Sequence, residues 1–288
     1  MLHLDWQELA REGENAYSTF FSRGSALSIG SFDGLHKGHC ALLKRLMKKG
    51  RELNLPCGVL TFSSPPRYLF SSSSPSCIST LRLKLENLEK MGLDFVILVD
   101  FSLNFAKMGG EYFVGLLKRY VNLKYLLVGE DFRFGSERSS SIEDMRDFSS
   151  KFFFSFEAFS SICGFCNEAK VSSSLIRKAI HEGDFLYISS FLQDGLDIDL
   201  LNAKPYEVGD KWFSFLREDL QQILPKDGEF LGVLRFLDGK EKEVKVLFDT
   251  QCVKLILNET VFTGHECGND EFNEEVPHFN ILKLKEKI

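Results

Sequence analysis

Short, unbroken runs of apolar residues alternate with helical segments over the first two thirds of this chain. The apolar runs are too short for buried helices, so we expect strands at residues 26–30, 57–62, 95–99 and 125–128. The segments between them carry apolar residues at helical spacing, and we expect helices at residues 42–49, 81–91 and 111–119. Gly50 should end the first of these helices. Apolar strands separated by helices are typical of a parallel sheet covered on both faces. Residues 1–193 are therefore predicted to form an α/β, doubly wound, Rossmann-like domain.

The pattern changes to strands alone in the last third of the chain. Apolar and polar residues alternate on both sides of Asp238-Gly239, a pair that is typical of a β-hairpin turn. The expected strands are residues 230–237, 243–248, 253–257 and 281–284. We therefore predict a small, mainly β, barrel-like domain over residues 194–288.

Composition and charge limit the classes of function. The 288 residues hold no apolar stretch near the ~20 that span a bilayer, and Asp5 and Glu8 stand where an export signal would be apolar. A net charge of −6 argues against broad binding to nucleic acid, yet allows a local anion pocket. Seven cysteines, an odd number, favour reduced thiols, although the spacing of Cys163 and Cys166 leaves a metal or redox role open. We expect a cytoplasmic protein with no membrane or nucleic-acid partner, as a monomer or weak oligomer.

Two histidines stand three residues apart directly after the first expected strand, in the segment Ser28-Ile-Gly-Ser-Phe-Asp-Gly-Leu-His-Lys-Gly-His39. In an open α/β sheet the ligand crevice lies at this end of the strands. The backbone N–H groups that open the next helix attract anions, and Gly34 and Gly38 let a polyphosphate approach the backbone. His36 and His39 could then donate hydrogen bonds to phosphate oxygens as negative charge grows during a transfer.

Other interpretations of the histidine pair stay open. Zinc binding is one, although Asp33 is the only nearby carboxylate and no thiol is suitably spaced. A pair of surface histidines without function is another.

A second polar cluster, Lys170-Val-Ser-Ser-Ser-Leu-Ile-Arg177, opens another helical pattern. Its serines could simply cap the helix, and Arg177 could be a surface charge. Alternatively, the hydroxyls, the helix amides and the guanidinium group form a second clamp for the same polyphosphate. We expect the two helix openings to grip one nucleotide.

Four motifs in order give the chain a resemblance to the prokaryotic FAD synthetases, normally bifunctional riboflavin kinase/FMN adenylyltransferases with an N-terminal nucleotidylyltransferase module. The motifs are Ile29-Gly-Ser-Phe-Asp-Gly-Leu-His-Lys-Gly-His39, Leu60-Thr-Phe-Ser-Ser-Pro-Pro66, Val128-Gly-Glu-Asp-Phe-Arg-Phe-Gly135 and Val171-Ser-Ser-Ser-Leu-Ile-Arg177. They span the adenylyltransferase module from end to end.

The resemblance implies a role for each matching residue. His36, His39 and Arg177 would be catalytic, through the phosphates of ATP. The other ATP-binding positions would be Gly30, Phe32, Asp33, Gly34, Gly38, Lys170, Ser173 and Ser174. Lys170 stands where the family often has Arg, which keeps the charge but loses the two-pronged fork. Phe62, Asp131 and Phe134 would bind FMN, with the two aromatic rings lining the flavin pocket.

The implied reaction is an in-line attack by the FMN phosphate on the α-phosphorus of ATP, which yields FAD and releases pyrophosphate. The attacking oxygen is already anionic and needs no general base, so catalysis consists of positioning and charge neutralisation, with Mg²⁺ assisting ATP.

The last third departs from the family pattern. Family members carry a Gly-x-Pro-Thr-Ala-Asn signature in the kinase barrel, whereas residues 209–217 here read Gly-Asp-Lys-Trp-Phe-Ser-Phe-Leu-Arg. We interpret residues 194–288 as a degenerate kinase domain without kinase activity. The alternatives are a bifunctional enzyme, an adenylyltransferase for another phosphate-bearing acceptor, and a flavin-binding protein without catalysis.

Overall fold

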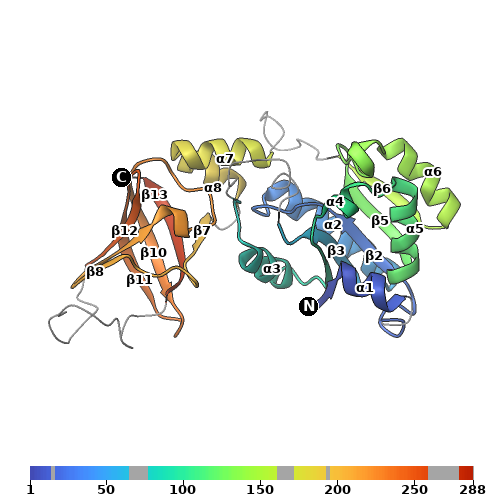
Figure 1. The fold of residues 1–288 in the computed structure, drawn as a ribbon, viewed down its shortest axis with the longest axis horizontal. Helices are drawn as coiled ribbons and strands as arrows, with labels where there is room; N and C mark the ends of the chain where they lie inside the picture. Colours follow the sequence, from blue (N-terminus) through green and yellow to red (C-terminus); the bar gives the residue numbers. More distant parts are fainter. Residues whose placement is uncertain (14–16, 65–76, 161–171, 193–194, 259–278, 288) are drawn as a thin grey trace. The chain divides into compact units, whose positions relative to one another are not determined.

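A computed structural model describes the chain except at residues 14–16, 65–76, 161–171, 193–194, 259–278 and 288. The chain divides into two compact units (Figure 1). The first comprises Met1–Pro75 and Lys84–Lys170, and the second comprises Ser76–Leu83 and Val171–Ile288. The second unit therefore includes residues 171–193. The predicted boundary between functional domains at residue 193 stays a prediction.

The first unit is built on a six-stranded sheet in the order β1-β4-β3-β2-β5-β6, in which every pairing is parallel. Its strands are β1 (Leu2–Asp5), β2 (Ser25–Ile29), β3 (Cys57–Phe62), β4 (Phe95–Val99), β5 (Leu123–Gly129) and β6 (Ser155–Phe159). Its α-helices are α1 (Trp6–Glu12), α2 (Lys37–Leu53), α4 (Leu103–Ala106), α5 (Gly110–Val121) and α6 (Ile142–Phe152), with a 3-10 turn at Ser136–Arg138. Helix α3 (Leu81–Lys90) begins in the second unit and continues in the first.

Alternate residues of the inner strands enter two separate hydrophobic clusters. On β2, Leu27 joins the cluster that includes α1 and α5, and Ala26 joins the cluster that includes α2. On β4, Phe95 and Val96 divide in the same way. Because successive side chains of a strand point to opposite faces, each cluster covers one face of the sheet. The predicted doubly wound α/β architecture is confirmed.

Gly50 does not end the first helix, which is a correction to the prediction. Helix α2 runs on to Leu53, and Asn54 closes it in the left-handed conformation. Gly50 is buried instead, and a Cβ atom there would lie 2.0 Å from the Cys57 sulfur. The missing side chain therefore lets α2 pack closely against β3.

The second unit is built on a seven-stranded sheet in the order β7-β13-β10-β11-β12-β9-β8, with antiparallel pairings. Its strands are β7 (Leu196–Asp199), β8 (Glu207–Gly209), β9 (Trp212–Leu216), β10 (Gly228–Phe236), β11 (Glu241–Phe248), β12 (Cys252–Leu257) and β13 (Phe279–Lys287). Its helices are α7 (Ser173–Glu182) and α8 (Phe185–Phe191), with a 3-10 turn at Arg217–Asp219. The core joins buried residues of both helices, among them Ile180 and Ile188, to Phe213, Phe215 and Phe230 of the sheet. The mainly β character predicted for this region is confirmed.

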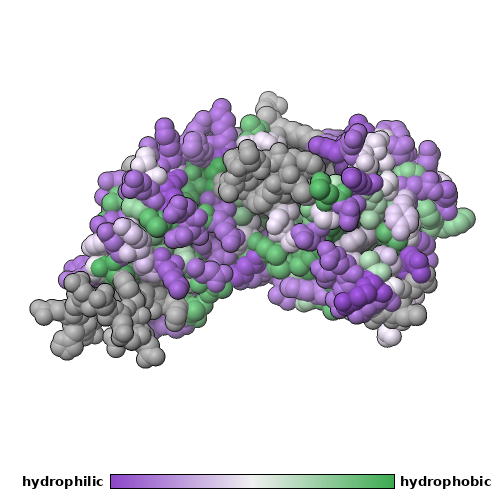
Figure 2. Space-filling model, viewed as in Figure 1, coloured by the Kyte–Doolittle hydropathy of each residue, from purple (hydrophilic) through white to green (hydrophobic). Residues whose placement is uncertain are grey.

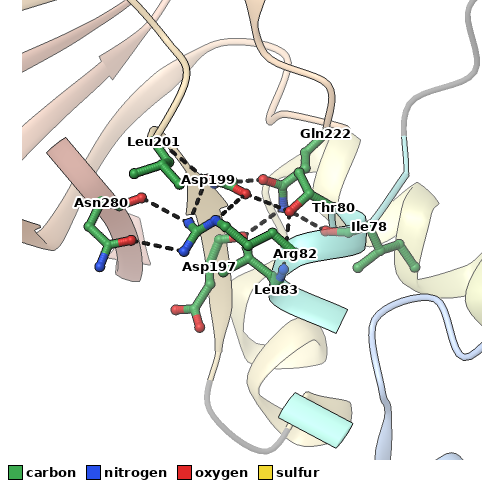
Figure 3. A network of polar contacts seen from close by, with 9 residues as sticks. All are labelled: Ile78, Thr80, Arg82, Leu83, Asp197, Asp199, Leu201, Gln222 and Asn280. Atoms are coloured by element: carbon green, nitrogen blue, oxygen red, sulfur yellow. Dashed lines mark hydrogen bonds and ion pairs between the residues drawn. The ribbon is translucent and has the colours of Figure 1, made fainter. Parts of the chain in front are cut away.

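A polar network ties residues 78–82 into the sheet of the second unit (Figure 3). The Arg82 guanidinium donates from Nε (2.9 Å) and Nη2 (2.5 Å) to the two oxygens of Asp199, and Thr80 donates to the same carboxylate at 2.6 Å. Arg82 Nη1 also donates to the Asn280 side chain at 2.9 Å. The Gln222 amide donates to the Ile78 carbonyl at 2.8 Å. A segment far away in sequence thus belongs to this unit through hydrogen bonds that are buried or partly buried.

Hydrophilic side chains predominate on the face drawn in Figure 2, and hydrophobic ones are scattered among them. Among the described residues, no helix has the length and apolar character needed to cross a bilayer.

Candidate active site

Three neighbouring parallel strands bring most of the predicted site residues of the first unit to one edge of its sheet. Strand β2 lies between β3 and β5. The loop that carries the first motif, here called the polar loop (residues 30–36), follows the carboxyl end of β2. Phe62 is the last residue of β3, and Asp131 follows β5. Because carboxyl ends of parallel strands share an edge, these residues lie at the place where open α/β sheets bind ligands.

The loop between β2 and α2 has an unusual backbone. Phe32 (φ 47°), Gly34 (φ 81°) and Leu35 (φ 35°) all have positive φ angles, which residues other than glycine rarely adopt. Phe32 and Asp33 are buried, and a Cβ atom on Gly30 would meet the Phe32 ring at 3.2 Å. The fold therefore holds a constrained turn immediately before the histidines, and such constraint is common at functional sites.

His36 is the N-cap of α2, and this fixes its tautomer. Its Nδ1 accepts a hydrogen bond from the His39 backbone N–H at 3.3 Å. A neutral imidazole that accepts at Nδ1 carries its proton on Nε2. The Nε2–H of His36 is therefore a donor whose direction is set by the helix cap.

The two imidazole rings stack on each other, with centroids 3.7 Å apart and planes 18° from parallel. Phe32 contacts the His39 ring edge to face at 5.3 Å. The His39 Nδ1 atom is buried and has no hydrogen-bond partner among the described residues. A buried polar atom without a partner costs free energy, so it marks a point where a ligand could supply one.

Both histidines are neutral at neutral pH. Burial lowers the pKa of His36 to about 4, against an opposing effect of the nearby Asp33 charge. Burial also lowers the pKa of His39 well below its usual value, and the neighbouring His36 adds to that shift. The pair therefore offers hydrogen-bond donors without a permanent positive charge.

The two aromatic residues predicted to line a flavin pocket belong to one aromatic cluster. Phe62 contacts Phe105 (6.5 Å between centroids), Phe105 contacts Phe113 (5.8 Å), and Phe113 contacts Phe134 (6.4 Å). Phe134 is buried, whereas Phe62 is partly exposed at the end of its strand. Phe105 and Phe113 gave no signal in the sequence, since one phenylalanine among 28 is most simply a core residue.

The serine–arginine cluster lies in the second unit, at the start of α7. Ser172 is the N-cap, and its hydroxyl accepts from the Leu175 N–H at 3.3 Å. Capping is thus the task of Ser172, while Ser173 and Ser174 occupy the first turn and Arg177 is half-buried. Lys170, Cys163 and Cys166 lie outside the described residues.

Within the described ranges, no three His, Cys, Asp or Glu side chains form a group that could hold a metal ion.

Sequence reasoning missed Lys84, a buried residue at the same sheet edge. Its Nζ donates to the Phe62 carbonyl at 2.8 Å and lies 3.4 Å from both the Ser31 carbonyl and the Thr61 hydroxyl. A signal was present, because Lys84 stands four residues before the buried Leu88 and so falls on the apolar side of α3.

Comparisons with known proteins agree with the motifs. A family model described as FAD synthetase matches residues 19–175. A bifunctional riboflavin kinase/FMN adenylyltransferase from Haemophilus influenzae is 35% identical over 188 residues, which are 65% of this chain and 57% of the relative. The protein of the same description from Escherichia coli K12 is 34% identical over 171 residues, 59% of this chain and 54% of the relative. The matches thus span little more than half the length of these relatives.

The comparison with solved structures found a likeness that extends over the whole chain. The structure described as macrolide-efflux protein from Streptococcus pneumoniae superposes with a TM-score of 0.78 at 19% identity, covering 100% of this chain and 91% of that one. At this identity the likeness concerns the fold alone.

Proposed function

Since this chain belongs to the FAD synthetase family, we propose that it is an FMN adenylyltransferase, which transfers AMP from ATP to the phosphate of FMN. An FMN phosphate oxygen forms the new bond to the α-phosphorus of ATP. The bond from that phosphorus to the bridging oxygen breaks, and pyrophosphate leaves with the electron pair. The observation that carries the proposal is the pair of neutral, stacked imidazoles at the start of α2, directly after β2.

The histidines act as oriented donors in this proposal. The His36 Nε2–H and the His39 ring donate to phosphate oxygens of ATP, and the first N–H groups of α2 favour the same anion. Such donors stabilise charge that develops in the transition state without reorganising during the reaction. Because both rings are neutral imidazoles at neutral pH, each donates its one N–H in a hydrogen bond, and neither serves as an imidazolium acid.

Further contacts of ATP are assigned to the polar loop and to α7. Gly30, Phe32, Asp33 and Gly34 of the loop shape the nucleotide site together with Gly38, which lies in the first turn of α2. Ser173, Ser174 and Arg177 bind the triphosphate through hydroxyl, amide and guanidinium donors. Mg²⁺ enters as part of the substrate Mg-ATP and neutralises phosphate charge.

FMN is assigned to the aromatic cluster. Phe62 and Phe134 line the isoalloxazine site, a role that their membership of one cluster supports. Asp131 is exposed after β5, and we assign it to the neighbourhood of the reacting phosphates from its place in the family motif.

One assay separates the candidate functions. The protein is incubated with Mg-ATP and, in parallel, with FMN, riboflavin or another phosphate-bearing acceptor, and the products are separated by chromatography. FAD and pyrophosphate from FMN support the proposal. An adduct formed only with another acceptor would instead make this an adenylyltransferase of different specificity, and binding of FMN without turnover would make it a flavin-binding protein.

The same assay tests the second unit, for which we propose no riboflavin kinase activity. Residues 209–212, where the family signature would lie, form the tight connection between β8 and β9, with Gly209 paired to Trp212. The Lys254 ammonium covers the Trp212 ring at 3.5 Å. FMN formed from riboflavin and ATP would contradict this part of the proposal alone.

His39→Ala should lower kcat for FAD formation by about 10²–10³-fold, the usual effect of removing one transition-state donor. His3→Ala is the matched control, because His3 is an exposed imidazole on β1 of the same unit. Steady-state rates of both variants are compared with those of the parent protein. Equal rates for H39A and H3A would remove His39 from the catalytic machinery.

A further inference from the structure

Lys84 is a buried charged residue to which the proposed reaction gives no task. It is the fourth residue of α3 and has 6% of its surface exposed. An ammonium group offers three N–H donors and no acceptor. Burying it is costly unless those donors are satisfied, so the position of its partners is informative.

Three described partners of Lys84 lie at the ends of two neighbouring strands, β2 and β3. Its Nζ donates to the Phe62 carbonyl at 2.8 Å, at the end of β3. At 3.4 Å it also meets the carbonyl of Ser31, just beyond the end of β2. The Thr61 hydroxyl connects the two strand ends, since it lies 3.4 Å from Nζ and itself donates to the Ser31 carbonyl at 3.0 Å.

Each of these strand ends leads directly to a proposed substrate contact. Ser31 precedes Phe32, whose strained backbone (φ 47°) places its ring against His39 at 5.3 Å. Phe62 is itself the flavin-lining residue of β3, where its ring meets Phe101 at 5.4 Å. A shift of the Ser31 carbonyl would therefore move the proposed ATP contacts, and a shift of the Phe62 carbonyl would move the proposed FMN contact. Either shift would change the distance between the two substrates.

We propose that Lys84 is a positioning residue. Its ammonium group sets the spacing between the loop that joins β2 to α2 and the end of β3 at Phe62. This inference rests on the proposed function for what the two loops bind. In this proposal Lys84 acts on the substrates only indirectly. It acts through Ser31 and Phe62, and its effect should fall mainly on kcat, because misplacing two bound substrates by about 1 Å can cost about 10²-fold in rate.

The test compares Lys84→Met with Lys118→Met. Lys118 is a matched control on α5, since its Nζ also donates to backbone carbonyls, those of Leu123 (3.0 Å) and Phe153 (3.3 Å). Leu123 begins β5, so these contacts lie at the opposite edge of the sheet. Lys84→Arg, which keeps the charge and the donors, is the rescue variant.

K84M should lower kcat about 10²-fold with a much smaller change in KM for ATP and FMN. K84R should recover part of the loss, and K118M should leave both constants near those of the parent. Amide hydrogen exchange supplies a readout that needs no turnover. Exchange at residues 31–36 and 62–64 should rise in K84M and not in K118M.

The outcomes separate the two proposals. If the parent protein makes no FAD but exchange rises in K84M alone, the proposed function fails and the positioning role stands. If K84M matches K118M in both exchange and kcat, the positioning role is overturned. Should K84M not fold, Thr61→Val removes the bridging hydroxyl with little change of shape, and the same comparison of exchange and kcat against K118M decides.

Discussion

Single residues at the sheet edge show what a sequence can and cannot predict about a site. The spacing of His36 and His39 after a buried strand indicated an anion site, and the structure places both at the start of α2. Their neutral charge state was not predictable, because it comes from burial by parts of the chain distant in sequence. The position of Lys84 on the apolar side of its helix was visible in the sequence, but only the fold shows that its carbonyl partners converge.

A neutral, buried histidine makes stability depend on pH. The pKa of His36 is about 4 in the folded protein, below its usual value of 6.5. The unfolded chain therefore binds protons first, and stability is lost as pH falls from about 6.5 towards 4. Between pH 7 and pH 5 the loss from this one group should be roughly 2 kcal/mol.

His36→Asn tests this pH dependence, because asparagine is a good N-cap but does not titrate. Urea unfolding at pH 7 and pH 5 should show a smaller loss of stability for H36N than for the parent protein. His3→Asn, which changes an exposed imidazole, should keep the slope of the parent. An H36N slope equal to that of the parent would contradict the assignment.

In the parallel sheet of the first unit, the inner strands were predictable and the edge strands were not. The expected strands at 57–62 and 95–99 coincide with β3 and β4, which are apolar because helices cover both faces. The edge strands β1 and β6 gave no signal, since most of their side chains are only partly buried. Apolar residues mark the buried positions of a strand. An edge strand has fewer buried positions, so its sequence carries a weaker hydrophobic pattern.

Two glycines in regular elements should respond in opposite ways to alanine. A Cβ atom on Gly58 of β3 would lie 2.5 Å from the ring of the fully buried Phe95, so G58A should cost about 1–3 kcal/mol through overpacking. A Cβ atom on Gly115 of α5 would meet Phe152 at an ordinary 3.5 Å. G115A should therefore stabilise the helix by about 0.5–1 kcal/mol. Urea unfolding measures both changes, and a shift of equal sign in the two variants would contradict this account.

At the scale of the whole molecule, the sequence predicted two structural classes in the right order but not how the chain is shared between them. Helices α7 and α8 follow a run of strand–helix alternation, yet their apolar faces pack in the core of the second unit. Residues 76–83 belong there too. Neither assignment could be made from periodicity, because a helical pattern shows which face is buried but not against what.

Asp199 should be important for the stability of the second unit. Burial raises the pKa of its carboxyl group, but hydrogen bonds from Arg82 and Thr80 outweigh that effect, so the net pKa is lowered. The contribution of the ionised Asp199 to the stability of the second unit is present at neutral pH. It is lost as the pH falls through this lowered pKa. Asp199→Asn leaves the Arg82 charge without its buried partner and should cost roughly 3 kcal/mol at pH 7.

The control is Glu229→Gln, which breaks the ion pair between Glu229 and Lys245 at the surface of the same unit. Exposed pairs contribute little, so the urea midpoint of E229Q should stay close to that of the parent. Equal midpoints for D199N and E229Q would show that the network around Asp199 carries no stability.

The placement of residues 76–83 in the second unit affects how such a protein could lose that unit. The backbone passes from one unit to the other three times, after residues 75, 83 and 170. A stop codon after residue 170 would delete the strands and leave Ile78, Thr80 and Arg82 behind, stripped of the side chains that satisfy them. Substitutions that accumulate within the second unit can leave these contacts intact. A single truncation would instead expose the polar groups of residues 78–82 to water.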